Sequence, residues 1–220
     1  GIGIVSNSLA FDNNNTPYLA FVYNSGGKVN VMKFDGSSWI QVGASNFSAG
    51  GAEYISLAID NNNNPYVAFR DNGNNGGHAT VMKFDGSSWV NVGSPAFSIS
   101  SVQHTSLAIN SNNEPYIAFR DVGNPNTGTS VMKFDGSGWT YVGNQEIDPV
   151  YSNHQNLVIY NDVPYVAFGG DYSGSGIKVT VKRFDGNSWV TVGSPGFSNG
   201  TDPASLDFII NNSGELFVSY

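Results

Sequence analysis

The sequence predicts an all-β fold made of one structural unit repeated about four and a half times, and three observations support this. The tripeptide Phe-Asp-Gly recurs every fifty residues, beginning at Phe34, Phe84, Phe134 and Phe184. A tryptophan follows each copy in the same phase, at Trp39, Trp89, Trp139 and Trp189. No window of eleven residues has the apolar spacing of a helix. A long, regular period of this kind indicates a solenoid, a propeller or a tandem array.

Each unit contains four predicted strands, which the second unit illustrates. Its strands are expected at residues 55–59, 66–70, 79–84 and 89–93. The turn at residues 60–65 consists of Asp, Asn and Pro, which favour turn conformations. A Gly- and Asn-rich loop at residues 71–77 joins the second and third strands, and Asp85-Gly86 is the dipeptide of a tight hairpin. The unit is therefore predicted to be a four-stranded antiparallel sheet.

Four antiparallel strands in about 50 residues are typical of a β-propeller blade. One blade cannot bury both of its faces, so blades pack radially around an axis. We expect a single domain, 1–220, with units at approximately 6–53, 54–103, 104–153 and 154–202 and an incomplete unit at 203–220. The resulting 4.5 blades fit a five-bladed ring with a thin last blade, a fragment of a larger ring, or open edges that pair between chains. A β-sandwich is the alternative fold, but it does not require so regular a repeat.

Two resemblances cover essentially the whole chain. The segment Tyr165–Gly170, the strand Val179–Phe184 and Trp189 together resemble a kelch blade. The segments Pro65–Phe69 and Lys83–Gly93 are similar to the ~50-residue tandem repeats of large secreted bacterial surface proteins. These resemblances imply propeller blades and a secreted or cell-surface location, and neither implies a catalytic residue.

The composition excludes several classes of protein. The formal net charge is −8 and only 12% of residues are charged, so a nucleic-acid partner is not expected. No apolar run approaches the ~20 residues of a membrane span, so membrane insertion is not expected. The absence of Cys excludes disulfides and zinc ribbons. Calcium-binding loop motifs are also missing, and we expect no cofactor. Instead, 28 Asn, 27 Gly and 27 Ser supply the polar surface.

The candidate ligand site lies where the loops vary between units. Loops after the second and fourth strands differ in length and composition, as binding loops do. Aligning the units on the Leu of the first strand gives one column at the mouth of the central channel: Ser6, Tyr54, His104, His154 and Pro203. The rings could stack on a sugar or hydrogen-bond to it, although such residues are also ordinary at loop ends. A metal site at the two histidines lacks further ligands.

Further candidates follow the second strand of each unit. Arg70-Asp71 and Arg120-Asp121 could grip a carboxylate or a pair of hydroxyls. Alternatively, each Arg pairs with a carboxylate of its own or the adjacent blade. Asp171 and Tyr172 are the candidates in the corresponding loop of the fourth unit.

The predicted function is a non-catalytic, carbohydrate-binding (lectin-like) module of a secreted or cell-surface protein. Gly, Asn, Ser and Tyr offer adaptable hydrogen bonds and flat apolar faces with little charge. The alternatives are a protein-interaction or spacer module of a long bacterial adhesin, and a glycoside hydrolase or lyase. Carboxylates lie on the variable face, but nothing in the sequence pairs them, so we expect no enzymatic activity; they are Glu53, Glu146, Asp148 and Asp171. A glycan or a protein surface is the expected partner, and self-association through open blade edges is a further expectation.

Overall fold

The computed structural model describes residues 3–24, 26–74, 76–123, 127–148, 150–172, 176–199 and 205–220. Within these ranges the chain forms eighteen strands and no helix. Consequently, no helix in the described part of the chain is long and apolar enough to cross a membrane. The strands form four sheets of four strands and one sheet of two strands. The all-β prediction and the four and a half blades are confirmed, and the sandwich alternative is wrong.

Each sheet is a meander in which consecutive strands pair antiparallel. The first blade comprises β1 (Ile4–Phe11), β2 (Pro17–Tyr23), β3 (Val29–Phe34) and β4 (Trp39–Gln41). The second comprises β5 (Ala52–Ile59), β6 (Pro65–Asp71), β7 (His78–Phe84) and β8 (Trp89–Asn91). The third comprises β9 (Val102–Ile109), β10 (Pro115–Asp121), β11 (Thr129–Phe134) and β12 (Trp139–Tyr141). The fourth comprises β13 (Ser152–Tyr160), β14 (Val163–Gly170), β15 (Lys178–Phe184) and β16 (Trp189–Thr191), and the fifth comprises β17 (Asp207–Ile210) and β18 (Leu216–Ser219).

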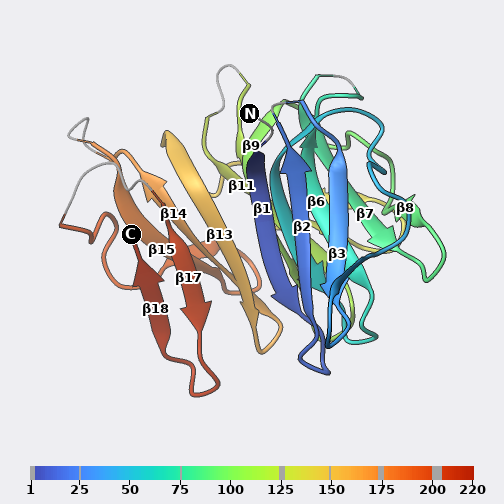
Figure 1. Cartoon of the computed structure of the whole chain (residues 1–220). Helices are drawn as coiled ribbons and strands as arrows, with labels where there is room; N and C mark the ends of the chain where they lie inside the picture. The colour runs from blue at the N-terminus through green and yellow to red at the C-terminus, as the bar shows by residue number, and fades with distance from the viewer. Residues whose placement is uncertain are drawn as a thin grey trace.

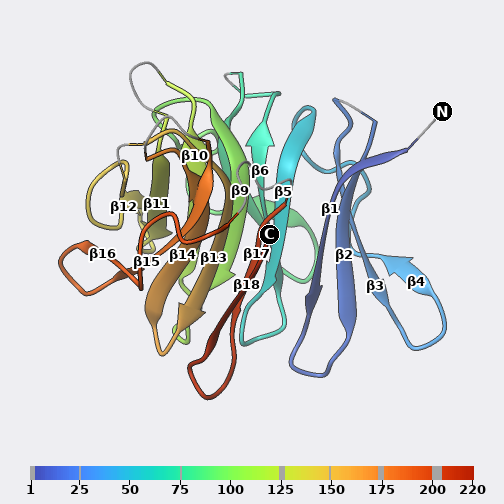
Figure 2. The same ribbon diagram turned by 90° about the vertical axis from the view of Figure 1, so that its left-hand side faces the viewer.

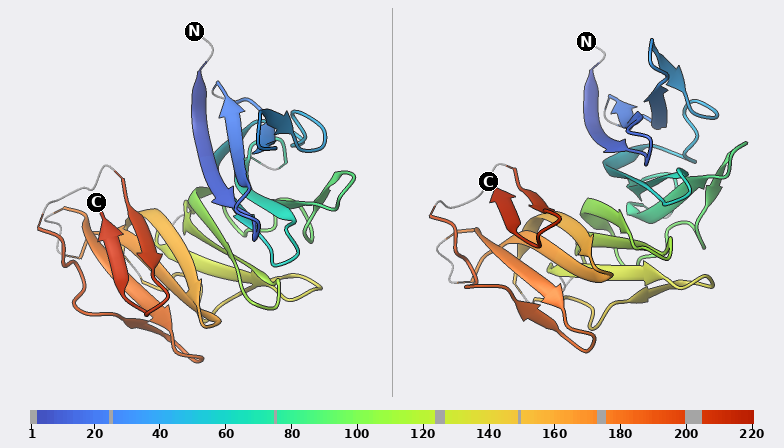
Figure 3. Two further views of the ribbon diagram at one scale, coloured as in Figure 1. Left: turned by 60° about the horizontal axis from the view of Figure 1, so that its bottom comes forward. Right: turned by 90° about the horizontal axis from the view of Figure 1, so that it is seen from below.

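The blades follow one another around a common axis. Figure 1 shows the first and fifth blades in front and the third behind them, and Figure 2 shows the first strands gathered towards the centre. Contacts link β1 with β5, β5 with β9, β9 with β13 and β13 with β17. Seen from below in Figure 3, the chain describes an arc, with the first and fifth blades at its two ends. This radial arrangement brings the start of every first strand to the axis.

The hydrophobic core lies between blades rather than within them. One cluster joins the first and second blades, another the second and third, and two more the later pairs. The indole nitrogen of Trp89 donates to the Val42 carbonyl of the preceding blade at 2.9 Å, and its ring stacks on Phe47 at 4.2 Å. Trp139 repeats both contacts with Val92 and Phe97. The tryptophan column of the sequence is therefore an inter-blade contact.

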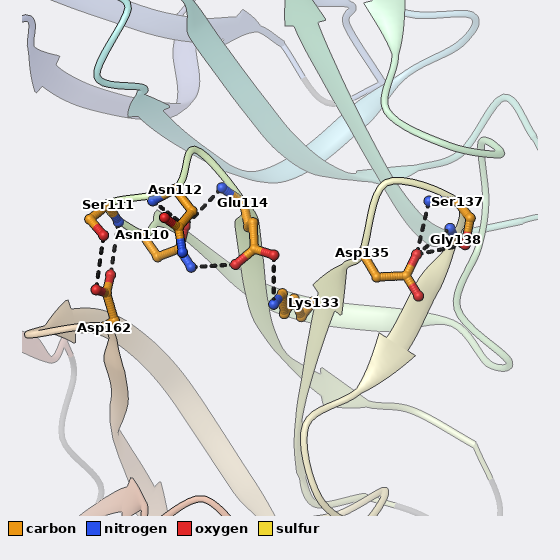
Figure 4. A network of polar contacts seen from close by, with 9 residues as sticks. All are labelled: Asn110, Ser111, Asn112, Glu114, Lys133, Asp135, Ser137, Gly138 and Asp162. Atoms are coloured by element: carbon orange, nitrogen blue, oxygen red, sulfur yellow. Dashed lines mark hydrogen bonds and ion pairs between the residues drawn. The ribbon is translucent and has the colours of Figure 1, made fainter.

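The repeated turns have structural roles. Asp60 Oδ1 accepts hydrogen bonds from the backbone of Asn62 and Asn64 at 2.9 and 2.8 Å. Asn110 and Glu114 take the same places in the third blade (Figure 4), where Glu114 pairs with Lys133 at 2.8 Å. Ordinary turn chemistry thus accounts for the Asn-rich segments.

The Asp-Gly column belongs to the hairpin turn, as expected. Asp135 Oδ1 accepts from the Ser137 and Gly138 amides at 2.8 and 2.9 Å (Figure 4). A hydrogen bond from the Ser137 hydroxyl at 2.7 Å and these two amides hold the pKa of Asp135 at about 2, so the carboxylate stays ionised and available as an acceptor.

One face of the first blade is not covered by another described blade, so its apolar residues are more exposed than their equivalents. Leu9 is 55% exposed, whereas Leu57 at the same place in the second blade is 6% exposed. Trp39 is 41% exposed, compared with 9% for Trp89. The difference arises because the described structure places no blade before the first one.

Candidate functional site

A pocket of about 400 Å³ lies near the axis and is lined by residues of all five units. Backbone and side chains from the first strand of each complete blade line it, together with Leu206 just before β17. The lining residues are Asn7, Tyr54, Ile55, Ser56, His104, Thr105, Ser106, His154, Gln155, Asn156 and Leu206. Most of these side chains can donate or accept hydrogen bonds, and the described lining contains no charged carboxylate. The pocket is therefore polar, and its described lining contains no Asp, Glu, Lys or Arg side chain.

Three predicted residues form a ladder of rings across this pocket. The ring centroids of Tyr54 and His104 are 4.8 Å apart, and those of His104 and His154 are 4.7 Å apart. These are the distances of aromatic contact. The prediction that the column gathers at the channel therefore agrees with the geometry for these three residues.

The ladder depends on an unusual backbone conformation. Tyr54, His104 and His154 have φ values of 49°, 51° and 51°, which bulky residues rarely adopt. At each of them the strand register shifts against the second strand of the blade. Such a bulge inserts one extra residue and redirects the side chain. Backbone strain of this type clusters at functional sites.

The central histidine is neutral at physiological pH. Burial lowers the pKa of His104 to about 4, and the nearby charges of His154 and Arg120 add to the effect. A neutral imidazole carries one N–H donor and one nitrogen acceptor. His104 can thus hydrogen-bond to a hydroxyl group in either direction.

Arg70 and Arg120, the predicted candidates at the ends of the second strands, each have a side-chain partner within the protein. Arg70 forms an ion pair with Glu53 at 2.9 Å. Arg120 donates to Gln103 at 3.2 Å and to the Tyr151 hydroxyl at 3.0 Å. Glu53 also lines a neighbouring hollow with Val5, Ser6 and Tyr54. The Glu53 carboxylate and the guanidinium groups of Arg70 and Arg120 therefore lie next to the ladder residues without lining the pocket.

The predicted carboxylates Asp71 and Asp121 do not reach the ligand-accessible surface, which corrects their assignment. They are 1% and 0% exposed. Asp71 accepts from the Gly73 amide at 2.9 Å and from the Thr80 hydroxyl at 3.0 Å. Asp121 accepts from the hydroxyls of Ser100 and Ser130, and burial raises its pKa. Both carboxylates fix the loop that follows the second strand.

Asp171 and Tyr172 do not line the axial pocket either. The Tyr172 hydroxyl donates to Asp148 at 3.0 Å, and Asp148 forms a largely buried ion pair with Lys182 at 2.8 Å. Burial raises the pKa of Tyr172, and the Asp171 amide donates to the Tyr151 carbonyl at 3.1 Å. These residues connect the loop before the fourth blade to that blade.

Several residues of the pocket were not predicted. Ser56 and Ser106 line it and also join the blades, because their hydroxyls accept the amides of Leu107 and Leu157 at 2.9 and 2.8 Å. Asn156 takes the corresponding place in the fourth blade and donates to Asp207 at 3.0 Å. The sequence pattern that could have identified these pocket residues is the serine that recurs one residue before the aligned leucine.

The alignment of the fifth unit was wrong by two residues. The pair Ile210–Leu216 closes the fifth hairpin as Ile59–Pro65 closes the second. Phe208, which is 2% exposed, therefore takes the place of Leu57. The counterpart of Tyr54 is Ser205, and Pro203 lies outside the described residues.

No metal site emerges from the described residues, where no three His, Cys, Asp or Glu side chains are grouped to hold an ion. No protein-family model matches the sequence, and no curated protein matches it.

Solved structures do resemble the chain. A protein of unknown function from Dyadobacter fermentans matches with a TM-score of 0.63 and 14% identity, over 99% of this chain and 74% of its own. The endo-arabinase of Bacteroides thetaiotaomicron matches with a TM-score of 0.61 and 14% identity, over 97% and 87%. The Aleuria aurantia lectin, in complex with Fucα1-6GlcNAc, matches with a TM-score of 0.58 and 14% identity, over 92% and 66%. At such identity the likeness establishes the β-propeller fold.

These comparisons correct one expectation. The chain was expected not to be an enzyme, yet glycoside hydrolases recur among the similar structures, including an arabinofuranosidase and a xylanase. The expectation that the chain is not an enzyme is therefore wrong, because the structures with a similar propeller include glycoside hydrolases as well as a lectin. The likeness to kelch blades and to tandem surface repeats stays a prediction.

Proposed function

We propose that this propeller recognises a carbohydrate and binds it in the axial pocket. The observation that carries the proposal is the ladder of Tyr54, His104 and His154, which lines a polar pocket built from residues of all five units. Supporting it, a lectin and several carbohydrate-active enzymes are among the similar structures.

The chemistry of the pocket suits a neutral sugar. Sugar rings offer hydroxyl groups at their edges and apolar C–H faces, so a site needs both hydrogen-bonding groups and flat rings. The ladder supplies the rings, while Ser, Thr, Asn and Gln side chains supply donors and acceptors. Because His104 is neutral, its ring adds no buried charge that the ligand would have to compensate. The volume of about 400 Å³ is within the usual range for small-molecule sites.

The proposal includes a secreted or cell-surface location, which rests on the resemblance to tandem surface repeats. Detection of the chain in the culture medium or by labelling of intact cells tests this part. Confinement to the cytoplasm would contradict it.

Binding to a glycan array, followed by calorimetry with the best ligand, tests the sugar site. Replacing His104 by Asn preserves tolerance of a positive φ but removes the ring, and we expect about tenfold weaker binding or more. Tyr54→Ala should act likewise. The matched control is Tyr23→Ala, since Tyr23 is 46% exposed and lies away from the pocket lining. An array without signal, or equal losses in all three variants, would contradict the proposal and favour a spacer or protein-binding module.

Glycoside hydrolysis is the second candidate, because two carboxylates flank the pocket from different blades. Glu53 precedes Tyr54 on β5, and Asp207 accepts a hydrogen bond from the pocket residue Asn156. Hydrolases of this chemistry place two carboxyl groups about 5–10 Å apart. Release of reducing ends from arabinan and xylan is the assay, with Glu53→Gln and Asp207→Asn as variants. Sugar release that both variants abolish supports hydrolysis; release that survives in both contradicts this assignment.

A further inference from the structure

Two consecutive blades carry an arginine at the same place beside the ladder. Arg70 on β6 lies opposite Glu53 of β5, and Arg120 on β10 lies opposite Gln103 of β9 in the same way. Glu53 and Gln103 each directly precede a ladder residue along the chain. The two guanidinium groups therefore take equivalent positions next to the axial pocket. The fourth blade has Gly169 at this place and so carries no guanidinium there.

The two arginines differ in whether a carboxylate neutralises them. Arg70 forms an ion pair with Glu53, with Nη1 2.9 Å from Oε2. In the third blade an amide replaces that carboxylate, and Arg120 donates to Gln103 at 3.2 Å and to the Tyr151 hydroxyl at 3.0 Å. Both acceptors are uncharged, and no carboxylate of the described residues forms an ion pair with Arg120. The positive charge of Arg120 therefore has no direct counterion in the described part of the chain.

The Arg120 guanidinium also keeps hydrogen-bonding capacity. Its bonds to Gln103 and Tyr151 both come from Nη1, so neither of them uses Nη2. Nε is buried without a partner among the described residues. The guanidinium carbon lies 4.1 Å from the centroid of the Tyr151 ring. Stacking of this kind holds the guanidinium plane in place, which pre-organises its remaining N–H groups for an anion.

The surroundings of Arg120 leave its charge available to a ligand. Asp121 follows it in the sequence, but this carboxylate is fully buried and accepts hydrogen bonds from Ser100 and Ser130. Burial is the main cause of the lowered pKa of His104, and the charge of Arg120 adds to it. An anion bound at Arg120 would therefore lie within electrostatic range of the axial pocket.

We propose that Arg120 forms an anionic subsite beside the axial pocket, which binds the carboxylate or sulfate of a sugar residue next to the one held by the ladder. Resting on the carbohydrate-binding function proposed above, this makes the ligand an acidic oligosaccharide, with a neutral ring in the pocket and its charged neighbour at Arg120. Arginine suits such a group because its planar N–H donors match anionic oxygens. The second blade offers no such subsite, because Glu53 already occupies the position of the anion at Arg70.

Matched pairs of glycans that differ only in the charged group test the inference. Oligogalacturonates and alginate oligomers are compared with their methyl esters, which keep the rings and linkages but lose the charge. Sulfated galactan oligosaccharides are compared with their desulfated forms. By calorimetry we expect the charged member of a pair to bind about tenfold more tightly than its neutral partner. This ratio should shrink as the salt concentration rises, because the contact is between charges near the surface.

Variants of the chain assign the effect to Arg120. Gln103→Glu installs the carboxylate that Glu53 supplies in the second blade, so it should reduce the ratio of the two affinities to about one. Arg120→Gln should reduce the ratio in the same way. The matched control is Gln41→Glu, which adds the same charge at an exposed position on β4 of the first blade and should leave the ratio unchanged. Circular dichroism checks that all three variants fold.

The outcomes separate this subsite from the carbohydrate-binding function. Equal affinity for charged and neutral members, binding of neutral glycans alone, or a preference that survives Gln103→Glu would overturn the anionic subsite and leave carbohydrate binding standing. A preference confined to uronates or to sulfated glycans would support the subsite and identify the anion. Absence of binding to every pair and to the glycan array would contradict carbohydrate binding itself, and the subsite with it.

Discussion

Trp89 and Trp39 occupy the same place in consecutive blades, but a described blade precedes only Trp89. Comparing the Ala variants of the two residues therefore measures the free energy of unfolding that one blade interface contributes. The exposed fraction falls from 41% at Trp39 to 9% at Trp89. About a third of a surface of ~250 Å² is therefore buried by the preceding blade, which at ~25 cal/mol per Å² is worth about 2 kcal/mol. The hydrogen bond from Trp89 to Val42 adds about 1 kcal/mol.

We therefore expect Trp89→Ala to lower the free energy of unfolding by about 3 kcal/mol more than Trp39→Ala does. Urea titration followed by far-ultraviolet circular dichroism measures both losses in the same protein, and unchanged m-values show that the comparison is valid. Equal losses at the two positions would refute the conclusion that the tryptophan column acts between blades. A larger loss for Trp39→Ala would refute the assignment of the first blade as the uncovered one.

Three further predictions concern ionisable groups. Lys182→Met should destabilise the protein by about 3–5 kcal/mol, because it leaves Asp148 buried without its cation; adding Asp148→Ser, which restores the residues of the other units, should recover most of that loss in urea titrations. His104 has a pKa of about 4 when folded and about 6.5 when unfolded, so the unfolded state binds more protons between these values. Stability should thus fall as the pH drops from 6.5 to 4, and His104→Asn should fall less steeply over this window. Finally, Asp85 should titrate at about pH 2 by carbon NMR, because its carboxylate accepts hydrogen bonds from Ser87 and Ser88; titration near pH 4 would contradict the turn geometry.

Much of the architecture could be predicted because the repeat is local. Phe-Asp-Gly, the Trp five residues later and the Asn-rich turn each fix a hairpin within a few residues of chain, through hydrogen bonds such as those of Asp135. Repetition then shows that successive units pack alike. The fifth unit was misaligned because Leu206 imitates the aligned leucine, while the hairpin pairing of Ile210 with Leu216 sets the true register.

The candidate site was only partly predictable. The column of Tyr54, His104 and His154 is visible in the sequence because it recurs in phase with the leucine. Burial of Asp71 and Asp121 is not visible, since charged residues after a strand are usually exposed and only the loop geometry encloses these two. The pairing of Asp148 with Lys182 likewise joins residues 34 positions apart on different blades.

The sequence by itself determined the all-β class, the four-stranded unit and the four and a half blades within these 220 residues, because these follow from short-range pattern and its period. The tertiary structure decided what the units enclose. Only when the first strands converge do the three rings come within 5 Å and form a polar pocket, and burial there keeps His104 neutral. Only the packing of blades shows that the tryptophans of the second, third and fourth blades each donate to a carbonyl of the preceding blade. Contacts between distant units depend on how strands curve and stack, which no local pattern of residues records.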